Sequence, residues 1–448
     1  MNDTIAAIAT APGPAGVCVV RISGQDALQI ADRLVPLTSH KPSRRAGGTF
    51  FYVTIVHPRT NEKIDDALML IFRAPRSFTG EEVVEIQGHG GTLPSRRLLD
   101  AVLAAGARLA ESGEFSKRAF LNGRMDLTQA EAICDFIQSK SERMAHAARE
   151  QMDGALGSRM TALYEAMLAH GADIEHQLDF DEGELSETVL LETTHALEET
   201  MKPLEQLLRV WNTHGHVLRE GVLVVLSGKP NAGKSSLLNA LLGRNRAIVH
   251  HVPGTTRDVI EETLLVEGIP LRLVDTAGLR IATDDVEQEG IARTQALMKQ
   301  ADVNLHLVDA VNVTEDELAA IPRDERSLCV LTKSDLLVVD KSLRPMGETI
   351  RISSQTGQGL DLLAQAILKK CGVVNVSEGL EIINQRHAQE LRMAYDAAEH
   401  ARRLLVQRNL VLAANELRRA AEALGRIVGR VYTDDLLDCI FSRFCVGK

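Results

Sequence analysis

The hydrophobic pattern changes twice along the chain, first from strands to helices and then to an alternation of both. Up to about residue 120, short apolar runs are separated by turns rich in Gly and Pro, such as TAPGPAG. The runs that we predict to be strands are VCVVRIS (17–23), FFYVTIV (50–56), DALMLIFR (66–73) and VVEIQ (83–87). This pattern predicts an α+β domain.

A helical pattern starts near residue 125 and continues to about residue 215. Thr128 and Glu131 match a capping box with Leu127 as its hydrophobic staple. Apolar residues then recur at helical spacing. The pattern breaks near DFDEGE (179–184), and it returns beyond residue 377 and holds to the end. We therefore expect long helices in two separated segments.

Between the helical segments, apolar runs of the buried-strand type alternate with helical runs. The predicted strands are VLVVLS (222–227), LRLVDT (271–276), NLHLVDA (304–310), LCVLTK (328–333) and TIRISS (349–354). This alternation is typical of a doubly wound parallel sheet. The fold class is thus multidomain α/β, and the expected segments are an α+β domain (1–120), a first helical segment (121–215), an inserted α/β domain (216–376) and a second helical segment (377–448).

Composition narrows the class of protein. The chain has 448 residues, which indicates two or three domains, and its 45% hydrophobic and 25% charged residues exclude a disordered chain. No apolar run approaches the roughly 18–20 residues that span a bilayer, and the N-terminus does not resemble a secretion signal. The six cysteines form no CxxC pair, so we expect neither zinc nor disulfides, and a reducing cytoplasm is the simplest location.

The net charge of −11 and the aromatic share of 3% argue against indiscriminate nucleic-acid binding. A polyanion would need a local basic patch. The C-terminal helices offer a phosphate-contacting surface for RNA, although such arginines more often pair with neighbouring acids on solvated helix faces. The candidates are Arg402, Arg403, Arg408, Arg418, Arg419, Arg426 and Arg430.

The segment GKPNAGKS (228–235) fits the phosphate-binding pattern GxxxxGK[ST], and it follows a predicted strand and opens a helical run. In such a loop, backbone N–H groups of residues such as Asn231, Ala232 and Gly233 surround the phosphates. Lys234 neutralises the β- and γ-phosphates, and the hydroxyl of Ser235 binds Mg²⁺. Ser236 follows at the start of the helical run. These residues predict a nucleoside triphosphate site.

Further motifs follow in the order that a GTPase requires. Thr255 and Thr256 lie where a threonine completes the Mg²⁺ shell. The run Asp275-Thr276-Ala277-Gly278 ends a strand. At such a position an aspartate holds the metal's water and a Gly amide senses the γ-phosphate. The run Thr332-Lys333-Ser334-Asp335 places Asp335 to accept the N–H groups of guanine, and Ser353, Ser354 and Gln355 supply an amide for its O6. Position 332 is Thr where the translation-factor-related GTPases usually have Asn, which puts tight support of the loop in question.

The residue that activates water is not evident from these motifs. In Ras-like enzymes a Gln follows DxxG, but here that position is Leu279. The acidic run DDVEQE (284–289) offers candidates, and its alternative interpretation is a solvated helix start. The motifs alone leave both open.

Several longer segments extend along the chain: RISG, FTGEEVVEIQGHGG, GEFSKRAFLNGRMDLTQAEA, GKPNAGKSSLLNALLG, VPGTTRD, DTAGLR and FCVGK. In these segments, which extend over essentially the whole chain, the sequence resembles the MnmE/TrmE family, the GTPases that modify wobble uridine in tRNA.

The resemblance implies a K⁺-stimulated GTPase that dimerises through its G domain, which is the inserted α/β domain at residues 216–376. Asn231 matches the residue whose side chain binds K⁺, His250 and Val252 match positions that offer carbonyl groups to it, and Thr255 lies near it. The histidine pair at 250 and 251 is by itself only a weak signal for a transition metal. Glu287 matches the residue that orients or activates the attacking water.

The resemblance also implies a tetrahydrofolate-binding N-terminal domain, with 5-formyl- or methylene-tetrahydrofolate as cofactor. Arg21, Glu85, Arg124 and Lys448 match the folate-contacting positions. Position 124 is often lysine in the family, and arginine keeps the charge with a different donor geometry. Cys445 matches a cysteine near the folate pocket that tRNA modification needs. From the residues alone, an inert cysteine is equally well supported, and the ending CVGK argues against prenylation.

These expectations describe a GTPase that acts with an FAD enzyme of the MnmG/GidA family. Together they would add an aminomethyl-type group to C5 of uridine 34 in certain tRNAs, with GTP hydrolysis gating the chemistry. Two alternatives remain: a regulatory GTPase of ribosome assembly, and a folate-dependent aminomethyltransferase with an appended GTPase.

Overall fold

The computed structural model describes residues 3–139, 142–180, 187–212, 221–244, 261–266, 269–275, 296–322, 324–337, 349–372 and 384–447. The chain forms two compact units, and each is built from separate segments. The first comprises Met1–Cys134, Glu150–Glu184 and Gln407–Lys448, and the second comprises Asp135–Arg149 and Leu185–Val406. The expected domain boundaries near residues 120, 215 and 376 stay predictions.

The first unit contains a six-stranded sheet with the order β3-β4-β5-β2-β1-β6. All pairs are antiparallel except that of β1 with β6. The strands are β1 (Ile5–Ile8), β2 (Val17–Ser23), β3 (Thr49–Val56), β4 (Lys63–Phe72), β5 (Val83–His89) and β6 (Arg108–Leu109). The four strands predicted from the sequence are confirmed, while the short strands β1 and β6 were not predicted.

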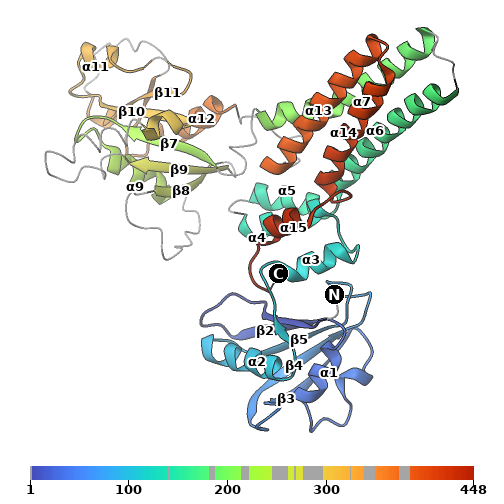
Figure 1. Cartoon of the computed structure of the whole chain (residues 1–448). Helices are drawn as coiled ribbons and strands as arrows, with labels where there is room; N and C mark the ends of the chain where they lie inside the picture. Colours follow the sequence, from blue (N-terminus) through green and yellow to red (C-terminus); the bar gives the residue numbers. More distant parts are fainter. Residues whose placement is uncertain are drawn as a thin grey trace, which may run out of the picture. The chain divides into compact units, whose positions relative to one another are not determined.

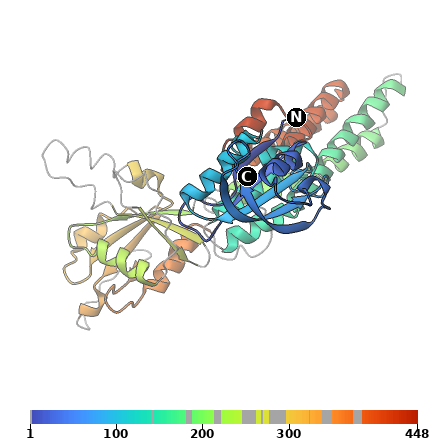
Figure 2. The same cartoon turned by 90° about the horizontal axis from the view of Figure 1, so that it is seen from below.

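Helices α1 (Ala27–Leu34) and α2 (Thr92–Ala104) cover one face of this sheet (Figures 1 and 2). Side chains alternate between faces along a strand, so Val20 and Ile22 of β2 point into the core beneath these helices. Arg21 and Ser23 therefore belong to the opposite face. Part of that face, over β1, is covered by Phe115 of α3 (Glu114–Leu121), which packs on Ile5 and Ala7.

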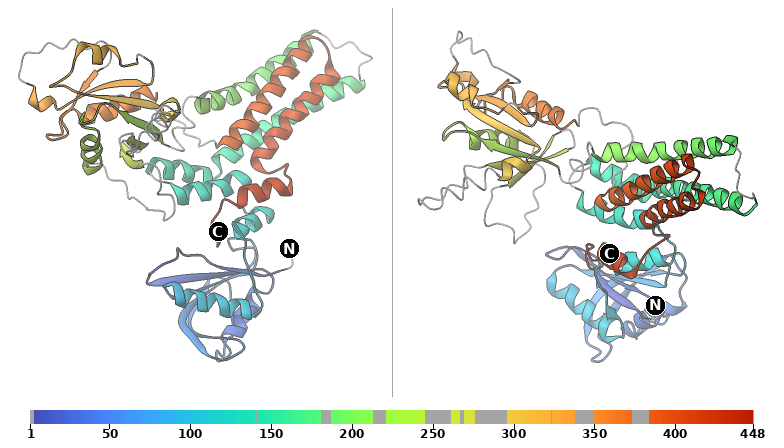
Figure 3. Two further views of the ribbon diagram at one scale, coloured as in Figure 1. Left: turned by 60° about the vertical axis from the view of Figure 1, so that its left-hand side comes forward. Right: turned by 45° about the horizontal axis from the view of Figure 1, so that its top comes forward.

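Long helices make up the rest of the first unit, and α14 runs along α6 (Figure 3). The helices that the structure describes in this part are α4 (Leu127–Gln138), α5 (Glu142–Met152), α6 (Ala155–Phe180), α14 (Leu410–Val428) and α15 (Asp434–Phe441), with α4 and α5 shared between the units. Their apolar faces explain the helical spacing seen in the sequence.

The predicted capping box at Thr128 and Glu131 is wrong. Helix α4 begins at Leu127, so Thr128 already lies inside it. Asp126 is the cap: its carboxylate accepts from the Gln129 amide at 2.9 Å, and the Gln129 side chain accepts from the Asp126 amide at 2.9 Å. This is the same reciprocal arrangement two residues earlier, and an ionised carboxylate is the stronger acceptor.

The second unit contains a six-stranded sheet with the order β12-β11-β10-β7-β9-β8. Its strands are β7 (Val222–Ser227), β8 (Glu261–Val266), β9 (Ile269–Asp275), β10 (Val303–Asp309), β11 (Ser327–Thr332) and β12 (Thr349–Arg351). The five predicted strands are confirmed and pair in parallel. Strand β8 was missed, and it pairs with β9 as an antiparallel edge strand.

Helices lie on both faces of this sheet, as a doubly wound fold requires. Leu237 of α9 (Lys234–Arg244) and Leu363 of α12 (Leu360–Lys370) share one core with the even-numbered residues of β7, whereas Val225 packs on the opposite face with Leu297 and Ala301. The short helix α11 (Glu315–Ala319) follows β10, and α13 (Gln385–Val406) packs on α7 (Glu187–Val210). Among the described helices, none is long and apolar enough to span a bilayer.

Candidate functional site

The predicted nucleotide motifs meet at one edge of the second sheet. The loop 228–233 follows β7, and β9, β10, β11 and β12 run parallel to it, so all their carboxyl ends lie at this edge. The register pairs Leu226 with Asp275 and Asp309 with Thr332. In open α/β sheets, ligands bind outside this edge. The motifs that are far apart in sequence are thus brought together.

The backbone of the loop between β7 and α9 needs its glycines. Gly228 and Gly233 have φ of +145° and +90°, values that side chains disfavour. A Cβ on Gly228 would lie 2.4 Å from the carbonyl oxygen of Leu307. Asn231 also has a positive φ, of 66°, and its side chain is exposed. The loop therefore holds the strained shape that lets amide groups surround phosphate.

The ammonium group of Lys234 lies within this loop. Its Nζ donates to the carbonyl oxygens of Gly228 and Lys229 at 2.8 and 2.9 Å, and the residue is 7% exposed. A buried ammonium held by two neutral carbonyl groups is well placed to exchange them for phosphate oxygens. Ser235 and Ser236 are exposed in the first turn of α9.

The hydroxyl of Thr332 braces the loop from the neighbouring strand. Its Oγ1 lies 2.7 Å from the carbonyl oxygen of Ala232 and 3.2 Å from that of Val308, and the residue is 1% exposed. A hydroxyl has one proton to donate, and the shorter contact is with the loop. Threonine at this position thus contacts the loop directly, while its effect on the strength of loop support stays a prediction.

The two loops expected to hold guanine are joined through their backbones. The Ser334 amide donates to the carbonyl of Ile352 at 3.0 Å, which ties the loop after β11 to the loop after β12. Asp335 is exposed in a short 3₁₀ turn, Ser334–Leu336. Ser353 is fully buried and its hydroxyl accepts from the Thr356 amide, while Ser354 and Gln355 are accessible.

Lys333 has the left-handed φ of 57°, and its Nζ lies 2.8 Å from Oδ2 of Asp309. A hydrogen bond from this ammonium is the main cause that lowers the pKa of Asp309 below its usual value. Asp309 ends β10, between the phosphate loop and the guanine loops. The sequence analysis did not single it out, although an acid at the end of a buried strand was a usable signal.

Several predicted residues lie outside the described part of the chain. They are His250, Val252, Thr255, Thr256, Thr276, Ala277, Gly278, Glu287 and Lys448. For Asp275 only the backbone is described, at the end of β9 beside Leu226. The predicted K⁺ ligands and the predicted water-activating glutamate thus stay predictions.

A second group of predicted residues lies on the open face of the first sheet. Arg21 and Glu85 are cross-strand partners, and Nε of Arg21 is 2.8 Å from Oε1 of Glu85. The guanidinium lies 5.3 Å from the ring centre of Phe78 and 5.7 Å from that of Phe115. The side chains of the pair are 18% and 16% exposed. A mostly buried charged pair, whose guanidinium lies near two aromatic rings, thus borders this face.

The C-terminal segment also reaches this domain. Val446 forms an antiparallel bridge with Ser112, and the Gly113 amide donates to the carbonyl of Cys445 at 3.4 Å. A Cβ on Gly447, whose φ is +97°, would lie 2.4 Å from the carbonyl oxygen of Ile8. Ile8 pairs with Val20, the neighbour of Arg21. The chain end therefore lies against β1 close to the Arg21 strand, and Cys445 is an exposed free thiol.

Arg124 is brought to the same domain but not into a described ion pair. It is exposed, and it lies beside Gly80, where an added Cβ would be 3.3 Å from Cγ of Arg124. Phe78 and Phe115, which frame Arg21, were missed by the sequence analysis. Each lies in a segment already singled out, FTGEE and GEFSK, so the signal was an aromatic residue within a charged motif.

Five of the seven candidate arginines of the C-terminal helices form described ion pairs with acidic residues. Arg402 and Arg403 pair with Glu399, Arg418 pairs with Glu175, Arg419 with Glu416, and Arg430 with Glu165. The structure therefore favours the interpretation as solvated helix faces. A phosphate-contacting surface built on these five arginines would first have to break their ion pairs.

Comparisons with known proteins agree with these sites. Residues 4–124 match the family model described as "GTP-binding protein TrmE N-terminus", and residues 127–445 match the "MnmE helical domain". The chain is 42% identical over 461 residues to a tRNA modification GTPase MnmE from Geobacter metallireducens, with 100% of both chains covered. It is 43% identical to the one from Nitrosomonas europaea, covering 100% of this chain and 99% of the other.

Among solved structures, the G domain of the T. maritima FeoB iron transporter matches 33% of this chain and 98% of its own, at 26% identity and a TM-score of 0.23, which supports no conclusion about the fold. The full-length relatives and the two family models are enough to assign the chain to a family. The chain belongs to the MnmE/TrmE family of tRNA modification GTPases, enzymes that hydrolyse GTP.

Proposed function

We propose that this GTPase acts with an FAD enzyme of the MnmG/GidA family to add an aminomethyl-type group to C5 of uridine 34 in certain tRNAs. A folate one-carbon unit, from 5-formyl- or methylene-tetrahydrofolate, is the carbon source. Carboxymethylaminomethyl and aminomethyl are the two expected forms of the product. The reaction takes place in the cytoplasm, and the working form is a homodimer that closes through its G domains.

The observation that carries this proposal is the placement of the C-terminal segment beside the Arg21 strand. Gly447 lies against Ile8, two residues from Cys445, in the same domain as the pair of Arg21 and Glu85. A GTPase alone has no use for an exposed thiol held by its backbone against the domain that carries this charged pair. A modification enzyme does, because a folate site and a reactive group must lie near each other.

The residues present fit a folate. The partly exposed ring of Phe78, which lies 5.3 Å from the guanidinium of Arg21, offers an apolar wall for a flat heteroaromatic group, and the carboxylate of Glu85 accepts N–H groups of a pterin. Arg21, Arg124 and Lys448 supply positive charge for the acidic tail. When bound, the folate supplies the one-carbon unit, while this chain orients it and excludes water.

In the G domain, Lys234 and the amides of Asn231, Ala232 and Gly233 hold the phosphates, and Asp335 with Lys333 and Ser353–Gln355 holds guanine. Ser235 and Thr256 are the proposed protein ligands of Mg²⁺, with Asp275 holding its water. Asn231, His250, Val252 and Thr255 are the proposed K⁺ ligands, and the loop 276–278 senses the γ-phosphate. Glu287 orients the water. A K⁺ at this place supplies the positive charge that an arginine finger provides elsewhere.

The potassium proposal is tested by the rate of GTP hydrolysis in KCl and NaCl of equal ionic strength. The rate should be high only in KCl for the wild type, because the larger ion fits a site of carbonyl and amide oxygens. The Asn231→Ala variant should lose the difference between the salts, whereas Asn239→Ala, an exposed asparagine of α9, should keep it. Equal wild-type rates in both salts would exclude the potassium site.

The folate proposal is tested by binding of 5-formyltetrahydrofolate to the full chain. Glu85→Gln should weaken binding by at least about tenfold, since one charge-assisted hydrogen bond contributes roughly that much. Glu62→Gln, at the exposed turn between β3 and β4, is the matched control and should bind as the wild type does.

A further inference from the structure

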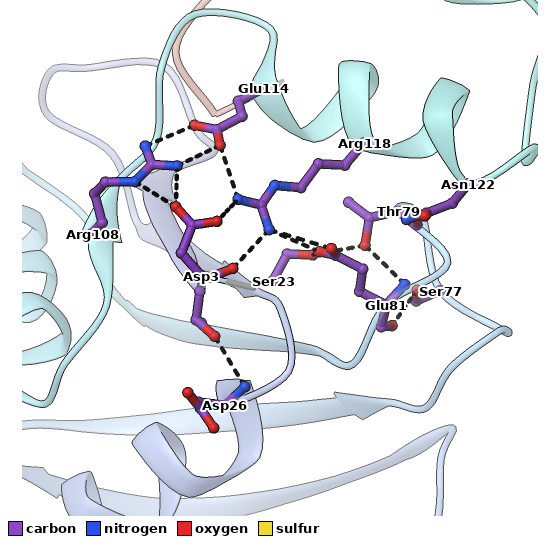
Figure 4. A network of polar contacts seen from close by, with 11 residues as sticks. Asp3, Ser23, Asp26, Ser77, Thr79, Glu81, Arg108, Glu114, Arg118 and Asn122 are labelled. Carbon is purple, nitrogen blue, oxygen red and sulfur yellow. Dashed lines mark hydrogen bonds and ion pairs between the residues drawn. The ribbon is translucent and has the colours of Figure 1, made fainter. Parts of the chain in front are cut away.

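A group of charged residues at one end of the first sheet is centred on a buried arginine of α3 (Figure 4). Its centre is Arg118, whose side chain is 1% exposed. The guanidinium lies 2.8 Å from Oδ1 of Asp3, 2.9 Å from Oε1 of Glu114 and 3.3 Å from Oε1 of Glu81. The planar guanidinium of Arg118 thus contacts residues of three segments: the N-terminus, helix α3 and the loop 77–82.

The loop 77–82 is fixed at several further points (Figure 4). The Ser23 hydroxyl, buried at the end of β2, lies 2.7 Å from Oε2 of Glu81 and 2.7 Å from the hydroxyl of Thr79. The Ser77 hydroxyl donates to the Glu81 carbonyl at 2.6 Å, and the Asn122 amide donates to the Thr79 carbonyl at 2.7 Å. Arg118 and Ser23 therefore both hold this loop through the carboxylate of Glu81.

The same loop carries one wall of the candidate folate pocket. Phe78, in its first turn, lies against the guanidinium of Arg21, and Gly80 lies against Arg124. Ser23 is two residues from Arg21 on the same face of β2, so the anchor and the pocket are roughly 7 Å apart along the strand. A shift of Glu81 would therefore move Phe78 relative to Arg21.

Stability alone does not account for this arrangement. Burying a guanidinium removes its favourable hydration, and the attraction of its ion pairs at best offsets this loss of free energy. Apolar residues of similar size often stabilise a core equally well. The planar guanidinium of Arg118, with its five N–H donors, also fixes the relative positions of three segments. Arg108 pairs with Asp3 and Glu114 in the same network, but its contacts described within residues 3–139 do not include the loop.

We propose that Arg118 is a positioning residue of the folate pocket: by holding Glu81 it sets the loop that places Phe78 against Arg21. The inference rests on the proposed folate function of that pocket. Lysine keeps the charge but cannot contact all three carboxylates in one plane, so Arg118→Lys should leave the domain folded with a displaced loop.

The first experiment measures binding of 5-formyltetrahydrofolate to the full chain, with the thermal unfolding midpoint of each variant. Arg118→Lys and Glu81→Gln should each weaken binding about tenfold. Arg108→Lys is the matched control: it perturbs the same network from the other side and should bind within about twofold of the wild type. Affinity that merely follows the unfolding midpoint across all three variants would contradict a positioning role.

A second readout reports the loop without any folate. In a chain carrying Phe78→Trp and Trp211→Phe, the emission of the indole depends on its contact with Arg21. Adding Arg118→Lys should shift the emission to longer wavelength and increase quenching by acrylamide, while adding Arg108→Lys should not. Unchanged emission with Arg118→Lys would overturn the inference. If the wild type binds no folate, the proposed ligand is wrong, but the emission still decides whether Arg118 sets the loop.

Discussion

The Thr332 hydroxyl lies 2.7 Å from the carbonyl oxygen of Ala232, so the residue that begins the guanine motif also braces the phosphate loop. The two motifs are separated by 100 residues in sequence. One hydroxyl therefore connects the start of the predicted guanine loop with the predicted phosphate loop. The usual asparagine is not needed for this contact, because the threonine oxygen already lies within reach.

Thr332→Val should remove that brace while preserving the packing of a residue that is 1% exposed. A buried carbonyl that loses its donor costs about 1–3 kcal/mol. We expect GTP affinity to fall about tenfold, measured by titration with a fluorescent GTP analogue. Thr332→Ser keeps the hydroxyl and should bind nearly as the wild type does. Equal affinity of the valine and serine variants would show that the brace is not used.

Asp335→Asn should change the choice of base. The carboxylate accepts two N–H groups of guanine, whereas an amide presents a donor in place of one acceptor. The variant should therefore lose GTP binding by about a hundredfold and gain binding of xanthosine triphosphate, whose ring offers a carbonyl there. Competition between the two nucleotides measures this. Asp361→Asn, in the first turn of α12, is the control and should leave the preference unchanged.

Glu114→Gln should destabilise the first unit in a pH-dependent manner. Burial acts to raise the pKa of Glu114, but hydrogen bonds from Arg108, the Glu111 amide and Arg118 outweigh it, so the pKa is lowered. A lowered pKa stabilises the fold fully above the ordinary value near 4.5, and this stabilisation is lost as pH falls through the folded-state pKa.

At pH 7 the glutamine variant leaves Arg118 short of a partner, which costs about 3 kcal/mol. The difference from the wild type should start to shrink as the pH falls below about 4.5 and should continue to shrink toward the lowered folded-state pKa, because Glu114 becomes protonated over this range. Urea unfolding followed by circular dichroism at several pH values measures it. A difference that stays constant from pH 7 to pH 3.5 would mean that the carboxylate charge does not contribute.

Much of the architecture follows from local pattern. The buried strands of the G domain were predictable because each is a short apolar run bounded by a turn. Strand β8 was missed because it is an edge strand that starts with two glutamates, so its apolar pattern is weak. At α4, the spacing of Thr128 and Glu131 matches a capping box, and only the structure shows that the helix starts after Asp126.

The candidate sites were predictable in part. The phosphate loop is contiguous, so its residues could be named from the sequence. Arg21 and Glu85 were identified only through a family resemblance, and their contact depends on the register of two strands separated by 64 residues. In the Arg118 network the pair with Glu114 has the i,i+4 spacing of helix α3, but no periodicity connects Arg118 with Asp3 or Glu81. Its discovery required the fold.

The most direct test of the account is mass spectrometry of nucleosides from bulk tRNA of cells that lack this protein. Such cells should lack C5-aminomethyl-type wobble uridines. The wild-type chain and Cys439→Ser, which alters another exposed thiol, should restore them, whereas Cys445→Ser should not. Unchanged wobble nucleosides in the deleted cells would contradict the tRNA chemistry proposed here and would favour a regulatory GTPase of ribosome assembly.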